Sequence, residues 1–336
     1  MAGTIRRVDE LLGNTLHHQE AIMKGKTKLT AVCILMLTLG VLGVQVSTVS
    51  GQGSWSALAG TANLVADQPA IQSPTASPYT EYVYQQTTLD AGSSGAAVAA
   101  CPNTAIVVGG GYAAYPDVTF YTQYKYENGW RGDAMNNSGS SQQITVYAVC
   151  LYNVSGASVT QVHGQVDVPS GDKGQAVAIC PAGSISTGGG FHAYPDGSLQ
   201  IYNSSRADGG EGWQSWARNR SGYTKTYHAY AICLSGSGGT TTDAYKSVDI
   251  APGSSGYAFP KCGSGELVTS GGFAAHTDLL IYSNSGPYSG DEWRVYARNT
   301  NTYNDRLLFA YAKCLLLRAQ IKYTIFLPLI LESYTP

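Results

Sequence analysis

One stretch decides the fold, and it reads Cys180-Pro-Ala-Gly-Ser-Ile-Ser-Thr-Gly-Gly-Gly-Phe191, then Trp213, Ala217-Arg-Asn219 and Tyr230-Ala-Ile-Cys233-Leu234. The same order of cysteine, glycine tract, tryptophan, Ala-x-Asn and Tyr-Ala-x-Cys-Leu occurs in a copy that ends near Cys150 and in another that ends near Cys314. The repeat unit is about 80 residues long. The sequence therefore predicts three related small modules.

Short alternating segments fill each copy. In the middle copy they cover residues 162–168, 175–180, 184–193, 198–202, 213–219 and 226–234. They carry β-branched and aromatic residues and are separated by Gly, Asn, Asp and Ser, which is typical of antiparallel strands. In the last segment, His228 and Tyr230 fall on one face and Tyr227 falls on the other. The pattern predicts an all-β protein.

The architecture has two alternatives. In the first, the chain forms three tandem small disulfide-closed antiparallel β-sandwich modules, with a bridge from the second to the last strand of each. In the second, the copies form a single three-fold β-prism. The run Ser235-Gly-Ser-Gly-Gly-Thr-Thr-Thr242 has the composition of a flexible linker, so it favours separate modules.

The cysteines support closed modules. Of the seven cysteines, Cys33 lies in an N-terminal apolar run, which leaves six in the repeats. If each module closes on itself, the pairs are Cys101 with Cys150, Cys180 with Cys233, and Cys262 with Cys314. Bridges that close loops of about 50 residues contribute roughly 4 kcal/mol each in the chain-entropy model. An even number of paired cysteines predicts an oxidising compartment.

The copies and their flanks divide the chain into segments. Module 1 covers residues 81–152, module 2 covers 160–234, a Gly/Ser/Thr linker covers 235–243, module 3 covers 244–317, and an apolar strand or tail covers 318–336. Before the modules, three lysines precede an apolar run, so residues 23–50 are predicted to be a signal peptide or membrane anchor. Residues 1–22 are interpreted as lying upstream of the true start, Met23, and residues 51–80 as a flexible stalk. We therefore expect a secreted or cell-surface protein.

Composition limits the partners. Charged residues make up 12% of the chain, and the formal net charge is −2. A nucleic-acid partner needs a concentrated positive charge, so none is expected. The 40 glycines and 24 tyrosines instead fit an extracellular β protein.

Four residue types recur at matching positions in the copies, and they are Trp130, Trp213 and Trp293; Tyr121, Tyr202 and Tyr282; Asp117, Asp196 and Asp278; and Asn136, Asn219 and Asn299. Aromatic faces with fixed polar groups are what a sugar site needs, so these are candidate ligand-binding residues. A tryptophan beside a disulfide is equally typical of a sandwich core, and Pro-Asp is ordinary turn chemistry. Glycan contact and core packing are both open interpretations.

The glycine tracts have a structural interpretation. Gly109-Gly-Gly111, Gly188-Gly-Gly190 and Gly271-Gly272 are each followed by an aromatic residue and flanked by strand patterns. A phosphate-binding loop would instead open a helix. The tracts therefore predict a bulge or a close approach of two backbones.

Catalytic patterns are missing from the repeats. We find no repeated Ser, His and Asp set, no Glu pair and no Cys-x-x-Cys, so we predict no catalytic residue, metal site or cofactor. The histidines occupy different repeat positions and are interpreted as incidental, namely His163, His192, His228 and His276.

The C-terminal tail is the most apolar stretch after the signal region. Counted from Cys314, it occupies the place of a first strand whose module does not follow. An apolar strand needs a cover, which is either module 3 itself or the sheet edge of a partner. The residues expected to make this assembly contact are Phe326, Leu327, Leu329, Ile330 and Leu331.

The pattern from Cys180 to Leu234 resembles repeats of secreted bacterial proteins that have no assigned activity. The ending Phe326-Leu-Pro-Leu-Ile-Leu331 is similar to short Leu-Pro-Leu tails on secreted proteins of filamentous, phototroph-related bacteria. The resemblance implies an exported or envelope protein and supplies no functional residues.

Two functions follow from these expectations. The first is a non-enzymatic structural or adhesive role, with self-association or a cell-envelope component as partner, in which filament subunits assemble through the C-terminal strand. The alternative is a multivalent carbohydrate-binding protein whose repeated sites gain avidity by linkage. Exposure of the tryptophans separates the two, because a sugar must reach them.

Overall fold

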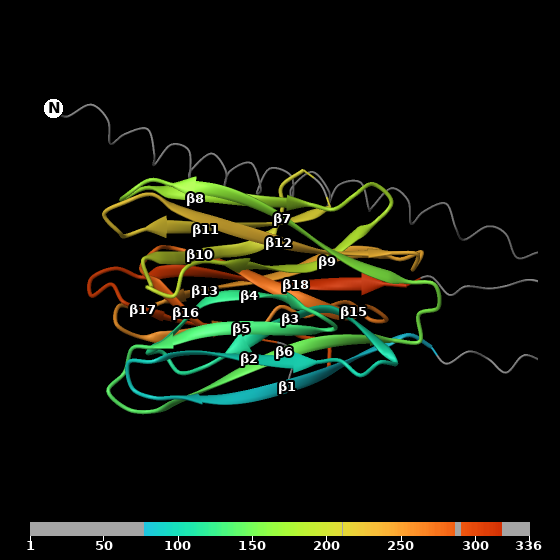
Figure 1. Ribbon diagram of the computed structural model, residues 1–336, viewed down its shortest axis with the longest axis horizontal. Coiled ribbons are helices and arrows are strands. Elements are labelled where there is room, and N and C mark those ends of the chain that lie inside the picture. The colour runs from blue at the N-terminus through green and yellow to red at the C-terminus, as the bar shows by residue number, and fades with distance from the viewer. Residues whose placement is uncertain (1–76, 210, 286–289, 318–336) are drawn as a thin grey trace, which may run out of the picture. The chain divides into compact units, whose positions relative to one another are not determined.

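Eighteen antiparallel strands make up the part of the chain that the computed structural model describes, residues 77–209, 211–285 and 290–317 (Figure 1). Module 1 contains β1 (Tyr79–Leu89), β2 (Ser94–Ala100), β3 (Ala105–Ala113), β4 (Val118–Tyr126), β5 (Gly129–Asn136) and β6 (Gln142–Tyr152). Module 2 contains β7 (Ser158–Val168), β8 (Lys173–Ile179), β9 (Ile185–His192), β10 (Leu199–Arg206), β11 (Gly212–Asn219) and β12 (Lys225–Ser235). Module 3 contains β13 (Thr240–Ile250), β14 (Ser255–Ala258), β15 (Leu267–Ala275), β16 (Leu279–Ser285), β17 (Arg294–Asn299) and β18 (Arg306–Leu316).

The predicted all-β class and the three-module organisation are confirmed. The six segments predicted in the middle copy correspond to β7 to β12, with differences only at their ends. The alternation in β12 is also as expected, because Tyr227 and Ala229 are buried while His228 and Tyr230 are half-buried. Within the described residues, no helix has the length and apolar character needed to cross a membrane. The predicted signal or anchor, most of the stalk and the tail lie outside the described residues.

Each module consists of two three-stranded layers that its own disulfide joins. In module 1, β1, β6 and β3 form one layer, and β2, β5 and β4 form the other. The three predicted disulfides are confirmed, and they are Cys101–Cys150, Cys180–Cys233 and Cys262–Cys314. In each, the first cysteine follows the second strand of its module and the other lies in the last strand. Three buried disulfides indicate an oxidising, extracellular environment.

The modules share their sheets, so the expectation that the linkers separate them is wrong. The three sheets have the strand orders β1-β6-β3-β16-β17-β14, β13-β18-β15-β10-β11-β8 and β2-β5-β4-β9-β12-β7. Each sheet therefore joins three strands of one module to three strands of another. The modules meet at β3 and β16, at β15 and β10, and at β4 and β9, so that each module is joined to both others. Figure 1 shows β7 and β8 of module 2 at the top, β1 and β2 of module 1 at the bottom and most strands of module 3 between them. Each module is the predicted disulfide-closed two-layered sandwich, and the three modules are joined through their sheets as in the alternative, a single three-fold β-prism.

The apparent linker is mostly strand. Module 2 ends with β12 at Ser235, and β13 already begins at Thr240. The three threonines at 240–242 pair with the end of β18. Only residues 236–239 connect the modules, and Gly236 and Gly238 adopt the left-handed conformation of a turn. The Gly and Thr composition therefore serves a tight turn and a β-strand.

The glycine tracts lie where β3, β9 and β15 contact one another. The middle glycine of each tract faces the indole of the module's own tryptophan, as Gly189 faces Trp213. The last glycine packs against the backbone of a strand from another module, as Gly190 does against the Gln123 carbonyl of β4. The pairing register also shifts beside each tract, as a bulge requires. Both the predicted bulge and the predicted backbone approach are confirmed.

Buried hydroxyl groups link the three modules at this centre. Thr187 Oγ1 donates a hydrogen bond to the Val108 carbonyl at 2.6 Å, and Thr269 Oγ1 donates to the Thr187 carbonyl at 2.6 Å. All three residues are fully buried. The surrounding apolar side chains form one continuous core with members from every module, such as Val108, Phe191 and Leu308. The described residues therefore fold as one unit.

Candidate functional site

The three tryptophans fill the core and do not reach solvent. Trp130, Trp213 and Trp293 are 0%, 1% and 0% exposed. Their indole N–H groups donate to polar side chains of the same module, at 3.4 Å for Gln123, 2.9 Å for Ser204 and 2.7 Å for Asn284. A sugar cannot stack on a ring that is already covered on both faces. The glycan interpretation of these three residues is wrong, and core packing explains their recurrence.

The three asparagines are also structural. Asn136, Asn219 and Asn299 are fully buried. The Asn219 side-chain amide donates to the carbonyls of Val168 at 2.8 Å and Tyr223 at 2.7 Å, while its oxygen accepts from the Ser221 amide at 2.8 Å. Asn136 and Asn299 make equivalent bonds. Each asparagine therefore holds the hairpin before the last strand against the end of the first strand.

Replacing Asn219 with alanine is expected to lower the free energy of unfolding by roughly 2 kcal/mol, because the buried Val168 carbonyl loses its partner. Chemical denaturation of the oxidised protein measures this loss. The matched control is Arg220→Ala, since Arg220 is exposed and adjacent. Equal stability of the two variants would show that Asn219 is not a structural residue.

The recurring tyrosines lie at bulges, where Tyr121 is buried and Tyr202 and Tyr282 are half-buried. Register shifts mark the positions of Tyr121, Tyr202 and Tyr282 in β4, β10 and β16. Tyr282 contacts Tyr296 at a centroid distance of 6.1 Å, and Tyr202 contacts Trp216 at 6.4 Å. Because the tryptophans of the repeat lie in the core, the structure does not bring these tyrosines and tryptophans together in one site.

The recurring aspartates lie in exposed turns, where each meets a cation. Asp196 pairs with Lys225 at 2.5 Å, and Asp278 pairs with Arg306 at 2.6 Å. Asp117 lies 3.8 Å from Arg298, which belongs to module 3. Partial burial acts to raise the pKa of Asp196, but hydrogen bonds from Lys225 and Ser198 outweigh it and lower that pKa to about 2. The Asp196 carboxylate is therefore charged at neutral pH.

Two turns of module 2 assemble an accessible site that the sequence did not predict as a unit. We define the end-turn site as Tyr194, Asp196, Tyr223 and Lys225. The Lys225 ammonium lies 4.9 Å from the Tyr194 ring centroid and 4.6 Å from that of Tyr223. The two rings are 44% and 63% exposed. The site thus offers two aromatic surfaces beside a charged pair.

The corresponding place in the other modules has different chemistry. In module 3, Arg306 binds Asp278, Asn304 holds the position of Tyr223, and the preceding residue, Tyr303, is 87% exposed. In module 1, Gln142 and Ser140 occupy the positions of Lys225 and Tyr223. The pairing of a cation with the turn aspartate therefore recurs in modules 2 and 3, whereas the contact of the cation with tyrosine rings is seen in module 2. Two features of the sequence predict this pairing. Lys225 and Arg306 both stand at the start of the last strand of their module, and each module has an aspartate in the turn after its third strand.

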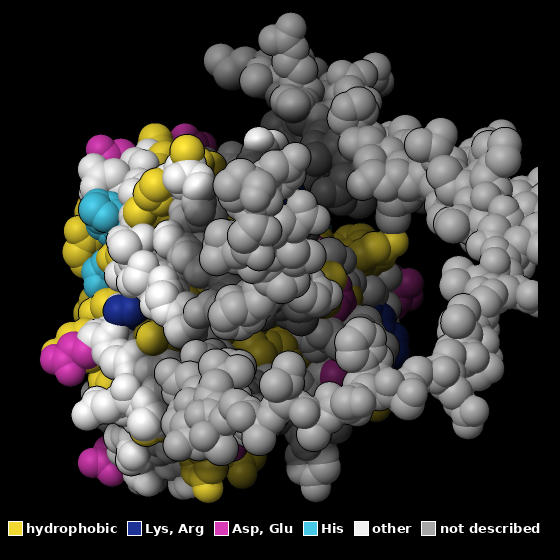
Figure 2. Space-filling view, turned by 90° about the vertical axis from the view of Figure 1, so that its right-hand side faces the viewer, with side chains coloured by type: hydrophobic (Ala, Val, Ile, Leu, Met, Phe, Trp, Pro, Cys, Tyr) yellow, Lys and Arg dark blue, Asp and Glu magenta, His cyan; other side chains and the backbone are white. Residues whose placement is uncertain are grey.

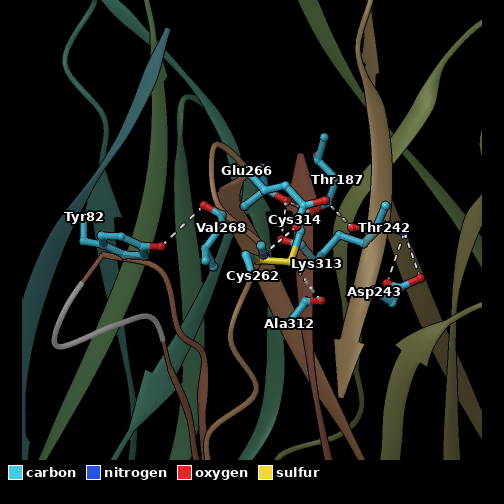
Figure 3. The surroundings of a disulfide bond; sticks show 12 residues. Tyr82, Thr187, Thr242, Asp243, Cys262, Glu266, Val268, Ala312, Lys313 and Cys314 are labelled. Carbon is cyan, nitrogen blue, oxygen red and sulfur yellow. Dashed lines mark hydrogen bonds and ion pairs between the residues drawn. A yellow bond between two sulfur atoms is a disulfide. The ribbon is translucent and has the colours of Figure 1, made fainter. Parts of the chain in front are cut away.

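One group of metal-ligating residue types surrounds the disulfide of module 3. Ligand atoms of Cys262, Glu266 and Cys314 lie within 4.8 Å of one another. Figure 3 shows both sulfurs joined to each other, and the Glu266 carboxylate accepts a bond from the Gly263 amide at 2.7 Å. The thiols are therefore unavailable to an ion while the bridge is intact.

The outer surface of the prism carries side chains and backbone groups that can contact a partner molecule. Half-buried and exposed tyrosines, paired charges and turn amides can bind polar partners with apolar surfaces. No known protein-family model matches the chain, and no curated protein matches it either.

Proposed function

We propose that the chain is a non-enzymatic extracellular adhesive protein that holds its target through exposed tyrosine side chains. One observation carries the proposal. Among the described residues, nine of the thirteen exposed large hydrophobic side chains are tyrosines. They are Tyr79, Tyr84, Tyr115, Tyr126, Tyr194, Tyr223, Tyr245, Tyr257 and Tyr303. Tyrosine gives a large, rigid contact with a polar end at a small cost in conformational entropy, which suits an adhesive surface.

The fold supports this role. Three disulfides and the shared sheets hold the exposed rings on a rigid frame, so binding does not have to order the frame. On the coloured part of the face in Figure 2, hydrophobic side chains, a class that includes tyrosine, lie between polar ones. Spread contacts favour attachment to an extended surface.

The location and the partner are part of the proposal. The predicted signal or anchor at residues 23–50 directs the protein to the cell surface or the medium, where the disulfides form. The target is a cell-envelope component or a further copy of the chain. Filament assembly through the apolar tail at residues 318–336 is retained as a prediction from the sequence.

Replacing Tyr223 and Tyr303 together with serine is expected to weaken attachment at least tenfold, because two accessible rings are lost. Attachment of the exported, oxidised protein to immobilised envelope material and to an immobilised copy of itself is measured on a biosensor. The matched control removes two exposed aliphatic side chains, Ile179→Ser with Leu316→Ser, and keeps every tyrosine. Equal losses in both variants would show that general apolar area, not tyrosine, mediates attachment.

The alternative is a carbohydrate-binding protein, and the end-turn site of module 2 favours it. Two accessible rings next to the Asp196 carboxylate and the Lys225 ammonium match the apolar and polar faces of a sugar. A glycan array separates the two functions. Selective binding of one glycan that Tyr194→Ser and Tyr223→Ser abolish would replace the adhesive proposal.

A further inference from the structure

Three histidines of module 2 gather on the outer face of the sheet β2-β5-β4-β9-β12-β7. His192 in β9 lies directly opposite His228 in β12. On the other side of β12, His163 in β7 lies opposite Tyr230, which makes His163 the diagonal neighbour of His228. The ring centroids of His192 and His228 are 5.7 Å apart, and those of His163 and His228 are 6.2 Å apart. Histidine side chains reach the molecular surface in Figure 2.

Two tyrosines close this group into a ring of five side chains. Tyr124 contacts His192 at 6.4 Å and stacks on Tyr230 at 5.2 Å. Tyr230 in turn contacts His163 at 6.1 Å. Tyr124 belongs to module 1, whereas the other four residues belong to module 2. Tyr124 therefore joins the cluster because the two modules share a sheet, whereas the three histidines come from module 2 alone.

Packing does not require histidine at these positions. The same pairing positions hold Tyr84, Ala113 and Thr145 in module 1, and Tyr245, Ala274 and Phe309 in module 3. The three modules thus adopt the same fold with different side chains at these positions. Only module 2 places three imidazoles next to one another. The histidines consequently call for a chemical explanation in addition to a structural one.

The hydrogen bonds of His192 orient one ring nitrogen outward. Thr122 Oγ1 lies 3.0 Å from His192 Nδ1 and donates to the Ala193 carbonyl at 3.4 Å. In the tautomer that carries the proton on Nδ1, His192 donates to Thr122 Oγ1 while that hydroxyl donates to the Ala193 carbonyl. The neutral ring then carries its lone pair on Nε2. This is the way in which a second residue fixes the tautomer of a metal-binding histidine.

His228 supplies an unpaired nitrogen at the centre of the group. Its Nδ1 is buried and has no hydrogen-bond partner among the described residues. Leaving a buried polar atom without a partner costs free energy, which a bound cation would recover. Burial lowers the pKa of both His192 and His228, and in His228 the two neighbouring histidines lower it further. Around His192, Asp133 opposes this effect and Arg131 adds to it. Neutral imidazole is the form that binds metal ions.

We propose that His163, His192 and His228 form a binding site for a divalent transition-metal ion of the Zn²⁺ class. Two imidazoles on one tetrahedral ion, with bonds of about 2.1 Å, have ring centroids roughly 5 Å apart. The observed separations of 5.7 Å for His192 and His228 and 6.2 Å for His163 and His228 exceed that value, and the ligand atoms of the three histidines do not all lie within 4.8 Å of one another, so the side chains must rotate toward the ion when it binds. Three nitrogen ligands leave a position for water or for a group from a partner. Thr122 acts as a positioning residue for His192.

Zinc titration of the exported, oxidised protein, prepared without a histidine tag, tests the site. Calorimetry is expected to show one Zn²⁺ per chain with an affinity in the micromolar range. His228→Gln should weaken binding at least about 30-fold, since it removes the central ligand. His163→Gln should weaken it about tenfold, and because His163 is exposed this variant keeps its fold.

The matched control is His276→Gln, which lies in module 3 outside the cluster, and it is expected to bind zinc like the natural chain. Thr122→Val should weaken binding several-fold without changing the stoichiometry. In histidine side-chain NMR spectra, zinc should shift the resonances of His163, His192 and His228 and leave His276 unchanged. Absence of one-to-one binding, or equal affinity in the His228 and control variants, would overturn the proposal.

Discussion

Gly190→Ala is expected to destabilise all three modules together. A Cβ at Gly190 would collide with the carbonyl oxygen of Gln123 and crowd the Cα of Tyr124, both in β4 of module 1. These are backbone atoms in a paired strand, so they cannot move aside as a flexible side chain would. Overpacking of this kind costs about 3 kcal/mol or more. Thermal unfolding of the oxidised protein should show one cooperative transition shifted to lower temperature.

Gly222→Ala is the matched control for this experiment. Gly222 belongs to the same module, and a Cβ there would meet no atom within 4 Å. The expected change in unfolding free energy is within about 0.5 kcal/mol. If the modules unfolded independently, Gly190→Ala would instead produce two transitions, with module 2 melting first. That result would contradict the shared-sheet organisation.

The glycine tracts show how far the sequence can predict this fold. Their place between strand patterns correctly indicated a bulge and a close approach of two backbones. It could not indicate which backbones approach, because the partner of Gly190 lies in β4, in a different copy. Copies of one repeat look alike whether each pairs with itself or with its neighbour. The wrong preference for separate modules came from residues 235–242, whose Gly and Thr content serves a turn and the start of β13.

The candidate site residues also fall into those that recur in every module and those that differ between modules. Repetition identified residues that every module needs, and Trp213 and Asn219 are therefore parts of the core and the hairpin. Residues that make accessible chemistry vary between copies, as Tyr223 and Lys225 do. Others meet only across a module junction, as Tyr124 and His192 do. Sequence repetition predicts what holds the prism together, whereas its surface chemistry depends on the exceptions to the repeat.

Removing the bridge of module 2 by Cys180→Ala with Cys233→Ala is expected to lower the unfolding free energy by roughly 4 kcal/mol. The bridge spans a sequence separation of 53 residues, and the reduced unfolded chain gains the entropy that the loop had lost. Because the three modules share sheets, the whole described unit should unfold at a lower denaturant concentration than the natural protein and still in one transition. Denaturation in guanidinium chloride, monitored by tryptophan fluorescence, measures the loss.

The bridge of module 1 provides the matched comparison. Cys101→Ala with Cys150→Ala opens a separation of 49 residues, so the chain-entropy model predicts nearly the same loss as in module 2. Both pairs are buried, and each double variant leaves two bridges in place. A loss in one module several kcal/mol larger than in the other would show that native packing around the cysteines, rather than loop closure, determines what a bridge contributes. Equal losses in a single shared transition would establish that each disulfide stabilises the entire prism.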